Sequence, residues 1–232
     1  MKKQKIIIGC EESQEVCKAF RKLGYEAYSC DTQDCSGGHP KWHIKEDILK
    51  VIKGGKFKTQ IGNKVIIKKW DIGIFHPPCT YLSYAATKWW NDKGRLRKRL
   101  KALDFFAKLW LAEIDKICIE NPMGCASPTI AKYTQIIQPY YFGDTESKRT
   151  CLWLKNLPQL KPTKIVKPKI YGYYKKGKKK GMPIYGNSYL KFSEDRGQIR
   201  SKTFKGIAKA MAEQWTATGG TLTPKKGGTE LS

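Results

Sequence analysis

The stretch "FHPPCTYLS" places Cys79 directly after two prolines, at the end of the apolar run "WDIGIF". A thiolate is a nucleophile, and two prolines restrict the backbone of the segment that carries it. This context is suited to hold a nucleophile in a fixed direction for attack on a substrate. A structural cysteine in a proline turn gives the same pattern, and for Cys79 taken alone that is the favoured interpretation.

Glu120 favours the nucleophilic over the structural interpretation of Cys79. It ends the apolar run "KICIE" and precedes Asn121 and Pro122. Burying a carboxylate is costly unless it is paired or protonated, so we expect a raised pKa for Glu120 and the ability to donate a proton or a hydrogen bond. The two residues together predict a thiolate that adds to a ring while the glutamate polarises a ring nitrogen.

Asp31 and Arg149 are weaker candidates. Asp31 ends the second of two strand-like segments, where an acid can accept hydrogen bonds from ribose hydroxyls; a solvated loop acid is the alternative. The preceding "GCEES" has one glycine and makes a poor pyrophosphate cradle, so an adenosine ligand without a pyrophosphate, such as S-adenosylmethionine, is favoured. Arg149 in "ESKRTCLWL" could hold a base carbonyl or a phosphate, or be a solvated residue at the end of a strand.

Apolar periodicity predicts the elements that position these residues. Strands alternate with helices, which predicts an α/β fold with a mostly parallel sheet and helices on both faces. Ligands of such sheets lie at the carboxyl ends of the strands, where Gly9, His76–Cys79 and Glu120–Pro122 are expected to gather. We expect strands near 5–9, 25–31, 70–75, 115–120, 140–143 and 150–155, and helices near 13–24, 95–114, 128–139 and 202–215.

The charge of the chain points to a polyanionic partner. Of 232 residues, 45 are Lys or Arg and 20 are Asp or Glu, which gives a net charge of +25. Nucleic acid is the first candidate, and a charge that serves solubility is the alternative. The segment 164–191 interleaves lysines with tyrosines, which can reach phosphates and stack on bases, although a disordered lysine-rich loop has a similar composition.

No run of about 18 apolar residues predicts a membrane span, and the short N-terminal apolar run is not a signal peptide. We therefore expect a cytoplasmic monomer that does not bind membranes and whose eight cysteines are reduced thiols. One cluster has a spacing that could bind zinc, but it matches no common finger and we predict no metal site. Its members are Cys30, Cys35, His39 and His43.

Taken together, these motifs resemble those of the DNA cytosine-C5 methyltransferases, in the short form found among phage-encoded enzymes, which would act in the host cytoplasm. Pro78-Cys79 matches the family's catalytic loop, Glu120-Asn121 its Glu-Asn dipeptide, and "SKRTCLWL" its basic motif that ends in a base-contacting arginine. "IIIGCEESQEVCKAF" looks like a degenerate glycine loop, and "FKGIAKAMAEQW" is similar to the closing helix.

The resemblance implies a Rossmann-like S-adenosylmethionine-dependent methyltransferase fold and double-stranded DNA as partner. The target cytosine would be flipped out, Cys79 would add to C6, Glu120 would contact N3 and the amino group, and C5 would take the methyl group. It implies catalytic roles for Cys79, Glu120 and Arg149. It implies cofactor contacts from Gly9, Cys10, Ser13, Asp31, Asp47, Ile48 and Pro77, and substrate contacts from Pro78, Thr80, Asn121, Lys148, Tyr173 and Tyr185.

The expected organisation is a catalytic and cofactor-binding domain over 1–157, a small basic target-recognition region over 158–200, a closing helix over 201–216 and a flexible tail over 217–232. The sequence departs from the family in three ways. The Phe-x-Gly-x-Gly motif is absent, Thr80 stands where many members have glutamine, and the recognition region is short.

Four alternatives stay open. "HPPCTY" also resembles the Asp-Pro-Pro-Tyr loop of amino-group methyltransferases, which modify N4 of cytosine or N6 of adenine without a nucleophile; there His76 replaces the acceptor acid and Glu120 has no role. The chain could also be a non-catalytic DNA-binding relative, act on RNA, or use a cofactor that donates a larger group.

Overall fold

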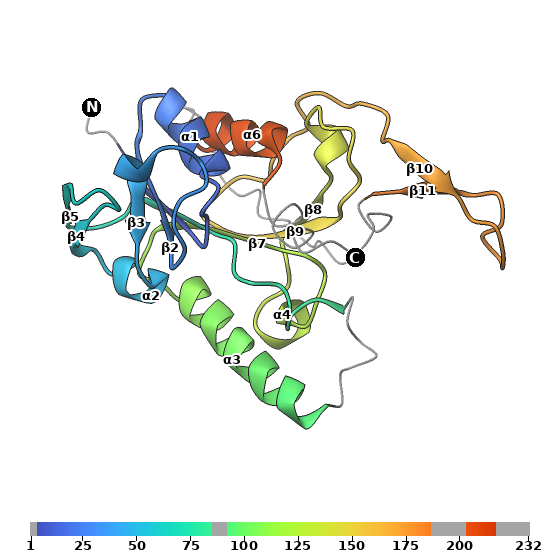
Figure 1. Cartoon of the computed structure of the whole chain (residues 1–232), viewed down its shortest axis with the longest axis horizontal. Coiled ribbons are helices and arrows are strands. Elements are labelled where there is room, and N and C mark those ends of the chain that lie inside the picture. The colour runs from blue at the N-terminus through green and yellow to red at the C-terminus, as the bar shows by residue number, and fades with distance from the viewer. Residues whose placement is uncertain (1–3, 85–91, 187–202, 217–232) are drawn as a thin grey trace, which may run out of the picture.

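The computed structural model describes residues 4–84, 92–186 and 203–216. Its centre is a seven-stranded sheet in the order β3-β2-β1-β6-β7-β9-β8 (Figure 1). The strands from β3 to β7 in this order are parallel, and β9 runs antiparallel to both of its neighbours. The strand bounds are β1 (Lys5–Gly9), β2 (Glu26–Asp31), β3 (His43–Lys45), β6 (Ile72–Phe75), β7 (Lys116–Asn121), β8 (Gln135–Ile137) and β9 (Thr150–Lys155).

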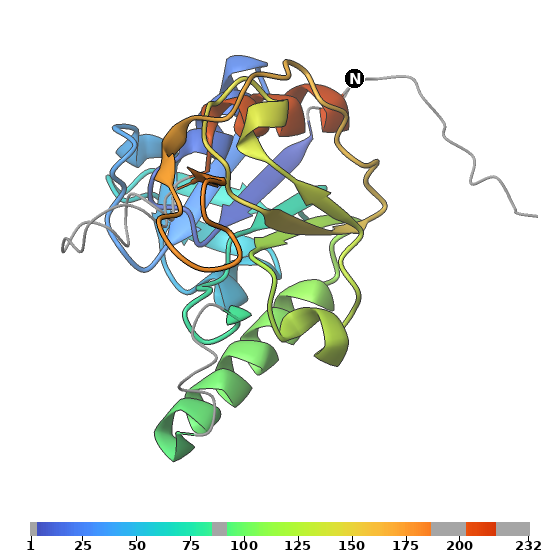
Figure 2. The same cartoon turned by 90° about the vertical axis from the view of Figure 1, so that its right-hand side faces the viewer.

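Helices cover both faces of the sheet (Figures 1 and 2). On one face α1 (Glu15–Lys22) and α6 (Lys205–Thr216) lie side by side, and Val16, Phe20 and Met211 belong to one buried apolar cluster. The other face is covered by α2 (Ile48–Val51), α3 (Lys93–Trp110) and α4 (Ala126–Thr129), which contribute Ile48, Phe106 and Ala126 to a second cluster. The sheet is therefore the middle of three layers.

The apolar run "KIIIG" shows why a strand of such a sheet has no polar alternation. Ile6, Ile7 and Ile8 are all fully buried. Successive side chains of a strand point to opposite faces, and accordingly Ile7 belongs to the cluster under α3 while Ile6 and Ile8 belong to the cluster under α1 and α6. A parallel strand covered on both faces has to be apolar at every position.

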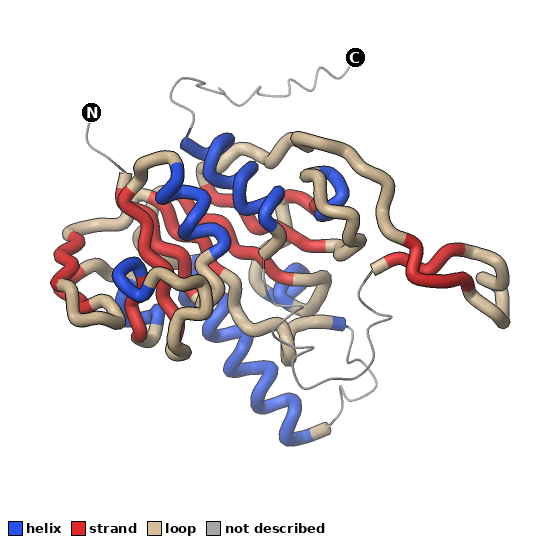
Figure 3. The backbone as a smooth tube through the Cα atoms, turned by 45° about the horizontal axis from the view of Figure 1, so that its top comes forward, coloured by secondary structure: helices blue, strands red, loops and turns tan. Residues whose placement is uncertain are grey.

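Two small hairpins lie outside the central sheet. One pairs β4 (Gly55–Lys58) with β5 (Lys64–Ile67), and the other pairs β10 (Ile170–Tyr173) with β11 (Pro183–Tyr185). The β10–β11 hairpin projects from the body of the molecule (Figure 3). Its base is held by hydrogen bonds from the Lys169 backbone N–H to the Thr145 carbonyl, at 2.7 Å, and from the Tyr171 hydroxyl to the Glu146 carboxylate.

The predicted mostly parallel α/β sheet with helices on both faces is confirmed. The predicted helix over 128–139 is wrong, because α4 ends at Thr129 and 135–137 form the edge strand β8. Two short 3₁₀ helices, η1 (Pro40–Trp42) and η3 (Pro139–Tyr141), complete the described elements. The predicted strand over 140–143 is wrong, because Pro139–Tyr141 form η3. The tail over 217–232 and the end of the predicted recognition region lie outside the described residues. Within the described ranges, no helix is long and apolar enough to cross a membrane.

Candidate active site

Three segments that are predicted to carry functional residues meet at one edge of the sheet. Gly9 of β1 pairs with Phe75 of β6, and Phe75 pairs with Ile119 of β7. Because these strands are parallel, the residues that follow them leave the sheet at the same edge, which is where α/β sheets bind their ligands. The expected gathering of the Gly9, His76–Cys79 and Glu120–Pro122 segments is confirmed.

At this edge His76 and Glu120 form a buried pair. The His76 Nδ1 atom lies 3.1 Å from Glu120 Oε2, and the two side chains are 8% and 13% exposed. An ionised carboxylate only accepts hydrogen bonds, so Nδ1 of His76 carries the proton and donates it. The other ring nitrogen, Nε2, is buried and has no hydrogen-bond partner among the described residues. A buried polar atom without a partner is costly, so this nitrogen marks a place for a ligand group.

The pKa of Glu120 contradicts the sequence prediction. Burial by itself raises this pKa, but the positive charge of Lys148 and hydrogen bonds from His76 and Thr150 outweigh it and lower the pKa to about 2. The predicted raised pKa of Glu120 is therefore wrong for the protein without substrate. The reason is that Lys148 and Thr150, at the start of β9, supply the positive charge and the donor that a buried carboxylate needs.

The loop over 76–84 that carries Cys79, called the Cys79 loop, is tied at one end to β7 and at the other to the segment that follows β7. The Asn121 side-chain amide donates to the Pro77 carbonyl at 2.7 Å. The Cys79 carbonyl accepts from the backbone N–H groups of Leu82 and Ser83, at 3.1 and 2.9 Å, and Ser83 forms a β-bridge with Gly124. Pro77 is buried while Pro78, Cys79 and Thr80 are exposed. The thiol is thus presented at the surface by a loop whose backbone is fixed from below.

Lys148 and Arg149 differ in where they lie. Lys148 is half-buried, and its charge acts on Glu120. Arg149 is exposed, and its charge acts instead on Cys151 and Tyr140. Arg149 therefore lies at the exposed rim of the site, and Lys148 lies near the Glu120 carboxylate.

The remaining predicted substrate residues lie on the projecting hairpin. Tyr173 and Tyr185 end β10 and β11, and their side chains are exposed. The β10–β11 hairpin is anchored to the segment that precedes β9, because its base bonds to Thr145 and Glu146. The base of the hairpin therefore lies beside the segment that leads to Lys148 and Arg149.

A cavity of about 630 Å³ opens beside the Cys79 loop, within the range of about 300–1,000 Å³ that is usual for small-molecule sites. Four of the predicted cofactor residues line it: Cys10, Asp31, Asp47 and Ile48. Three other predicted cofactor residues, Gly9, Ser13 and Pro77, do not line the cavity. Pro78, which is a predicted substrate contact, does line it. No residue of α6 lines it either.

The chemistry of this wall fits an adenosine ligand. Asp31 is the last residue of β2, and among the described residues its Oδ1 accepts from the Gln33 side chain, the Gln33 backbone N–H and the Thr32 hydroxyl. A partly exposed carboxylate such as that of Asp31 can accept hydrogen bonds from ribose hydroxyls. Asp47 caps α2 through the Leu49 N–H, at 2.9 Å, and the apolar side chains of Ile48 and Phe105 provide faces for a planar base.

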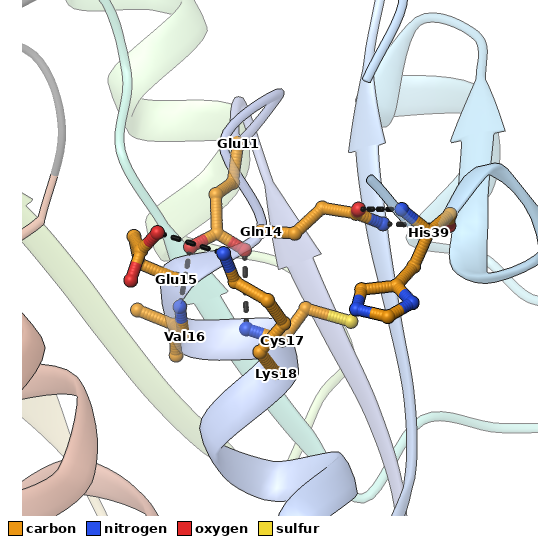
Figure 4. A network of polar contacts seen from close by, with 7 residues as sticks. All are labelled: Glu11, Gln14, Glu15, Val16, Cys17, Lys18 and His39. Atoms are coloured by element: carbon orange, nitrogen blue, oxygen red, sulfur yellow. Dashed lines mark hydrogen bonds and ion pairs between the residues drawn. The ribbon is translucent and has the colours of Figure 1, made fainter. Parts of the chain in front are cut away.

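Glu11 shows that the site has no pyrophosphate cradle (Figure 4). This carboxylate is buried at the N-terminus of α1 and accepts the backbone N–H groups of Val16 and Cys17, at 2.6 and 3.2 Å. Burial raises its pKa to about 7, although the charge of His76 and the two backbone hydrogen bonds partly offset the rise. Helix N-terminal amides that would face a phosphate are here occupied by the protein's own side chain.

The residues considered for zinc have other partners. His43 contacts Ser29 Oγ through Nδ1 and the Gln33 carbonyl through Nε2, both at 2.9 Å, and Cys30 Sγ donates to the Glu46 carbonyl at 3.2 Å. Within the part of the chain that the structure describes, no group of three or more His, Cys, Asp or Glu side chains could hold a metal ion. All eight cysteines lie in that part, and none is in a disulfide.

Sequence reasoning missed His76 and Glu11 as site residues. His76 stands between a buried strand and the two prolines, and a titratable residue at a strand's carboxyl end was a usable signal. Glu11 interrupts the segment where a glycine loop was sought. Lys98 and Lys101 of the cavity wall gave no comparable signal, because only the packing of α3 brings them to the site.

No protein-family model and no curated protein matches this chain. Solved structures of similar shape include the Entamoeba histolytica methyltransferase EhMeth, with 15% identity and a TM-score of 0.42. They also include a mutant of Spodoptera frugiperda DNMT2, with 16% identity and a TM-score of 0.38. In both cases the match covers 72% of this chain and 58% of the other protein, so this chain spans less than two thirds of their length. The sheet order described above agrees with the predicted Rossmann-like arrangement of a mostly parallel sheet with helices on both faces.

Proposed function

We propose that this protein is an S-adenosylmethionine-dependent DNA cytosine-C5 methyltransferase. One observation carries the proposal: the exposed Cys79 sits on a loop that Asn121 fixes, at the same sheet edge as the buried carboxylate of Glu120. A nucleophile next to a carboxylate is what covalent addition to a pyrimidine ring requires. The adjoining cavity and the net charge of +25 provide for the cofactor and the DNA.

In this proposal the Cys79 thiolate adds to C6 of a flipped cytosine, and the electron pair moves through the ring toward N3. The Glu120 carboxylate accepts a hydrogen bond from the exocyclic amino group. Entry of the base removes water from the site, which favours the protonated carboxyl that N3 needs. His76 holds Glu120 in place, and Arg149 contacts the base at the rim. Once C5 has gained the methyl group, loss of the C5 proton to water and elimination of the Cys79 thiolate restore the aromatic ring.

Asp31, Asp47 and Ile48 would hold the cofactor, with Cys10 behind them. S-adenosylmethionine supplies an electrophilic methyl group when it is bound. The thiol of Cys10 is not a second nucleophile, because burial and the nearby charges of Asp31 and Asp47 raise its pKa to about 12.

One observation favours a second candidate, methylation of an exocyclic amine. In its neutral form, with the proton on Nδ1, His76 presents a buried lone pair at Nε2, and this atom has no partner in the described residues. Such an acceptor, next to the "PPCTY" loop, could orient an amino group for direct methylation. This reaction needs no thiolate, which separates it from the first proposal.

Nucleoside mass spectrometry tests the two. Wild type and Cys79→Ser are each incubated with S-adenosylmethionine and mixed-sequence duplex DNA, with Cys35→Ser as a cysteine control away from the site. We expect 5-methylcytosine from wild type and from Cys35→Ser, and none from Cys79→Ser. A methylated exocyclic amine that persists in Cys79→Ser would establish the second candidate. Absence of any modified base with the wild type would reject both.

A further inference from the structure

The first half of α3 carries a concentration of positive charge that its own stability does not call for. Five cations are at least partly exposed along it, namely Lys93, Arg95, Arg97, Lys98 and Lys101. Among the residues the structure describes, the only ion pair within α3 joins Lys108 to Asp104, near the other end of the helix. The first turn contains no acidic residue, and Asp92 is engaged as the N-cap of the helix, accepting the Arg95 N–H.

This arrangement is unfavourable for an isolated helix. The N-terminal end of a helix carries a partial positive charge, so cations there are repelled. Lys93, Arg97 and Lys101 are four residues apart and lie in one row, where like charges destabilise a helix. Lys98 lies next to this row, three residues before Lys101. A feature that works against stability at several positions points to a partner that offsets the repulsion.

The basic row adjoins the proposed active site. Lys98 and Lys101 line the cavity together with Pro78 and Tyr81 of the Cys79 loop. Arg95 reaches the same loop: its Nη2 donates to the Thr80 carbonyl at 2.8 Å, and its guanidinium lies 5.1 Å from the centre of the Tyr81 ring. The Lys98 ammonium lies 5.6 Å from that ring. Whatever binds the row therefore lies next to Cys79.

We propose that Lys93, Arg97, Lys98 and Lys101 form a binding surface for the phosphodiester backbone of duplex DNA beside the target base. This inference rests on the proposed function and adds to it the place where the DNA backbone lies. An extended row of exposed lysines and arginines suits a polymer of regularly spaced phosphates. Arg95 belongs to the same element but faces the loop, so α3 joins the DNA-binding surface to the segment that carries the nucleophile.

Two variants with the same loss of charge test this surface. The first is Lys93→Gln/Arg97→Gln/Lys101→Gln. The control is Lys56→Gln/Lys64→Gln/Lys68→Gln, on and beside the β4–β5 hairpin, which lies at the opposite end of the molecule from β10–β11 (Figure 1). Binding of a fluorescent duplex of about two helical turns, about 20 base pairs, is measured by anisotropy over a range of salt concentrations without cofactor.

We expect the α3 variant to bind at least about tenfold more weakly at low salt. Its slope of log K against log salt should be shallower by about 2 to 3, since each phosphate contact contributes about 0.9. The control should keep the wild-type slope within about one contact. Because the substitutions relieve repulsion within the helix, the thermal midpoint of the α3 variant should equal or exceed that of wild type, which separates lost binding from lost folding.

Equal binding by the two variants overturns the inference, as does a wild type that binds only RNA. These outcomes are independent of the methylation test. If wild type forms 5-methylcytosine and the α3 variant binds like its control, the proposed function stands and the proposed surface is wrong. If DNA binding depends on α3 but no base is modified, the proposed surface stands and the proposed function is wrong.

Discussion

His76 and Glu120 link the strand that presents the nucleophile to the strand that presents the carboxylate. The hydrogen bond from His76 Nδ1 to Glu120 Oε2 fixes which carboxylate oxygen is left for a substrate. It is also one of the interactions that keep Glu120 ionised despite its burial. The orientation and the charge of Glu120 therefore depend on the same neighbour.

Replacing His76 should affect both properties. In His76→Ala the donor is lost, so the pKa of Glu120 should rise from about 2, and methyl transfer should slow by about 100-fold, the usual scale for a group in acid–base chemistry. His76→Asn places an amide N–H near the Nδ1 position and should recover most of the rate. Carboxyl NMR titration measures the pKa, and initial rates measure catalysis. An alanine variant with an unchanged Glu120 pKa would contradict this account.

Residues at strand ends could be predicted from the sequence, but their charge states could not. Cys79, Glu120 and Asp31 each follow an apolar run, and parallel strands deliver their ends to one edge. The low pKa of Glu120 depends on Lys148 and Thr150, which reach it only because β9 inserts antiparallel beside β7. A neighbour brought by sheet pairing leaves no local pattern in the sequence.

At the scale of elements, the wrong helix over 128–139 has a similar cause. Ile136 and Ile137 can satisfy a helical spacing or a strand, since a short apolar run does not distinguish the two. The strand forms because β9 is available for pairing: Ile136 pairs with Cys151 and Ile137 pairs with Thr150. The longer α3 and α6 were predictable because their apolar positions recur over several turns.

Gly124 joins the Cys79 loop to the segment that follows β7, and its lack of a side chain is what permits this. A Cβ at this position would lie 1.9 Å from the Leu82 carbonyl oxygen, which accepts the Cys125 N–H at 2.9 Å. Gly124→Ala should therefore push the loop away, lower stability by about 1–3 kcal/mol and reduce methyl transfer more than tenfold.

Thermal melting and initial rates of the same preparation measure these two effects. Gly94→Ala is the matched control. The nearest atom to its new Cβ is the Asp92 side chain, at 3.3 Å, and alanine favours the helix by about 0.5–1 kcal/mol. We expect its thermal midpoint to rise. A Gly124→Ala protein with wild-type melting and wild-type rate would show that the Ser83–Gly124 contact does not position the loop.

At the scale of the whole molecule, positive charge is unevenly distributed over the surface. The first half of α3 and the tip of the β10–β11 hairpin both expose lysines, and both project from the three-layer body (Figures 1 and 2). Buried ionisable groups lie at the sheet edge between the layers, where His76 is close enough to influence both Glu11 and Glu120. The surface charge is the part for which we propose a nucleic-acid partner, and the charge in the interior makes stability depend on pH.

The dependence of stability on pH should show two opposite slopes. The pKa of Glu120 is lowered from 4.5 to about 2, so its contribution is present above pH 4.5 and is lost as the pH falls toward 2. The pKa of Glu11 is raised from 4.5 to about 7, so the folded protein binds its proton more tightly, and this contribution is present below pH 4.5 and is lost as the pH rises toward 7. The second loss is about 3 kcal/mol, at about 1.4 kcal/mol per pKa unit.

Glu11→Gln isolates the second slope. The amide keeps an acceptor for Val16 but loses the one for Cys17, so the variant should be less stable near pH 4.5 and yet lose no further stability between pH 4.5 and 7. Urea unfolding at a series of pH values measures the difference from wild type. Glu120→Gln is the control, because it should remove the acid slope and leave the fall above pH 4.5 intact. A Glu11→Gln curve parallel to that of wild type over this interval would mean that Glu11 does not hold the proton and that the helix cap at the site is a carboxylate throughout.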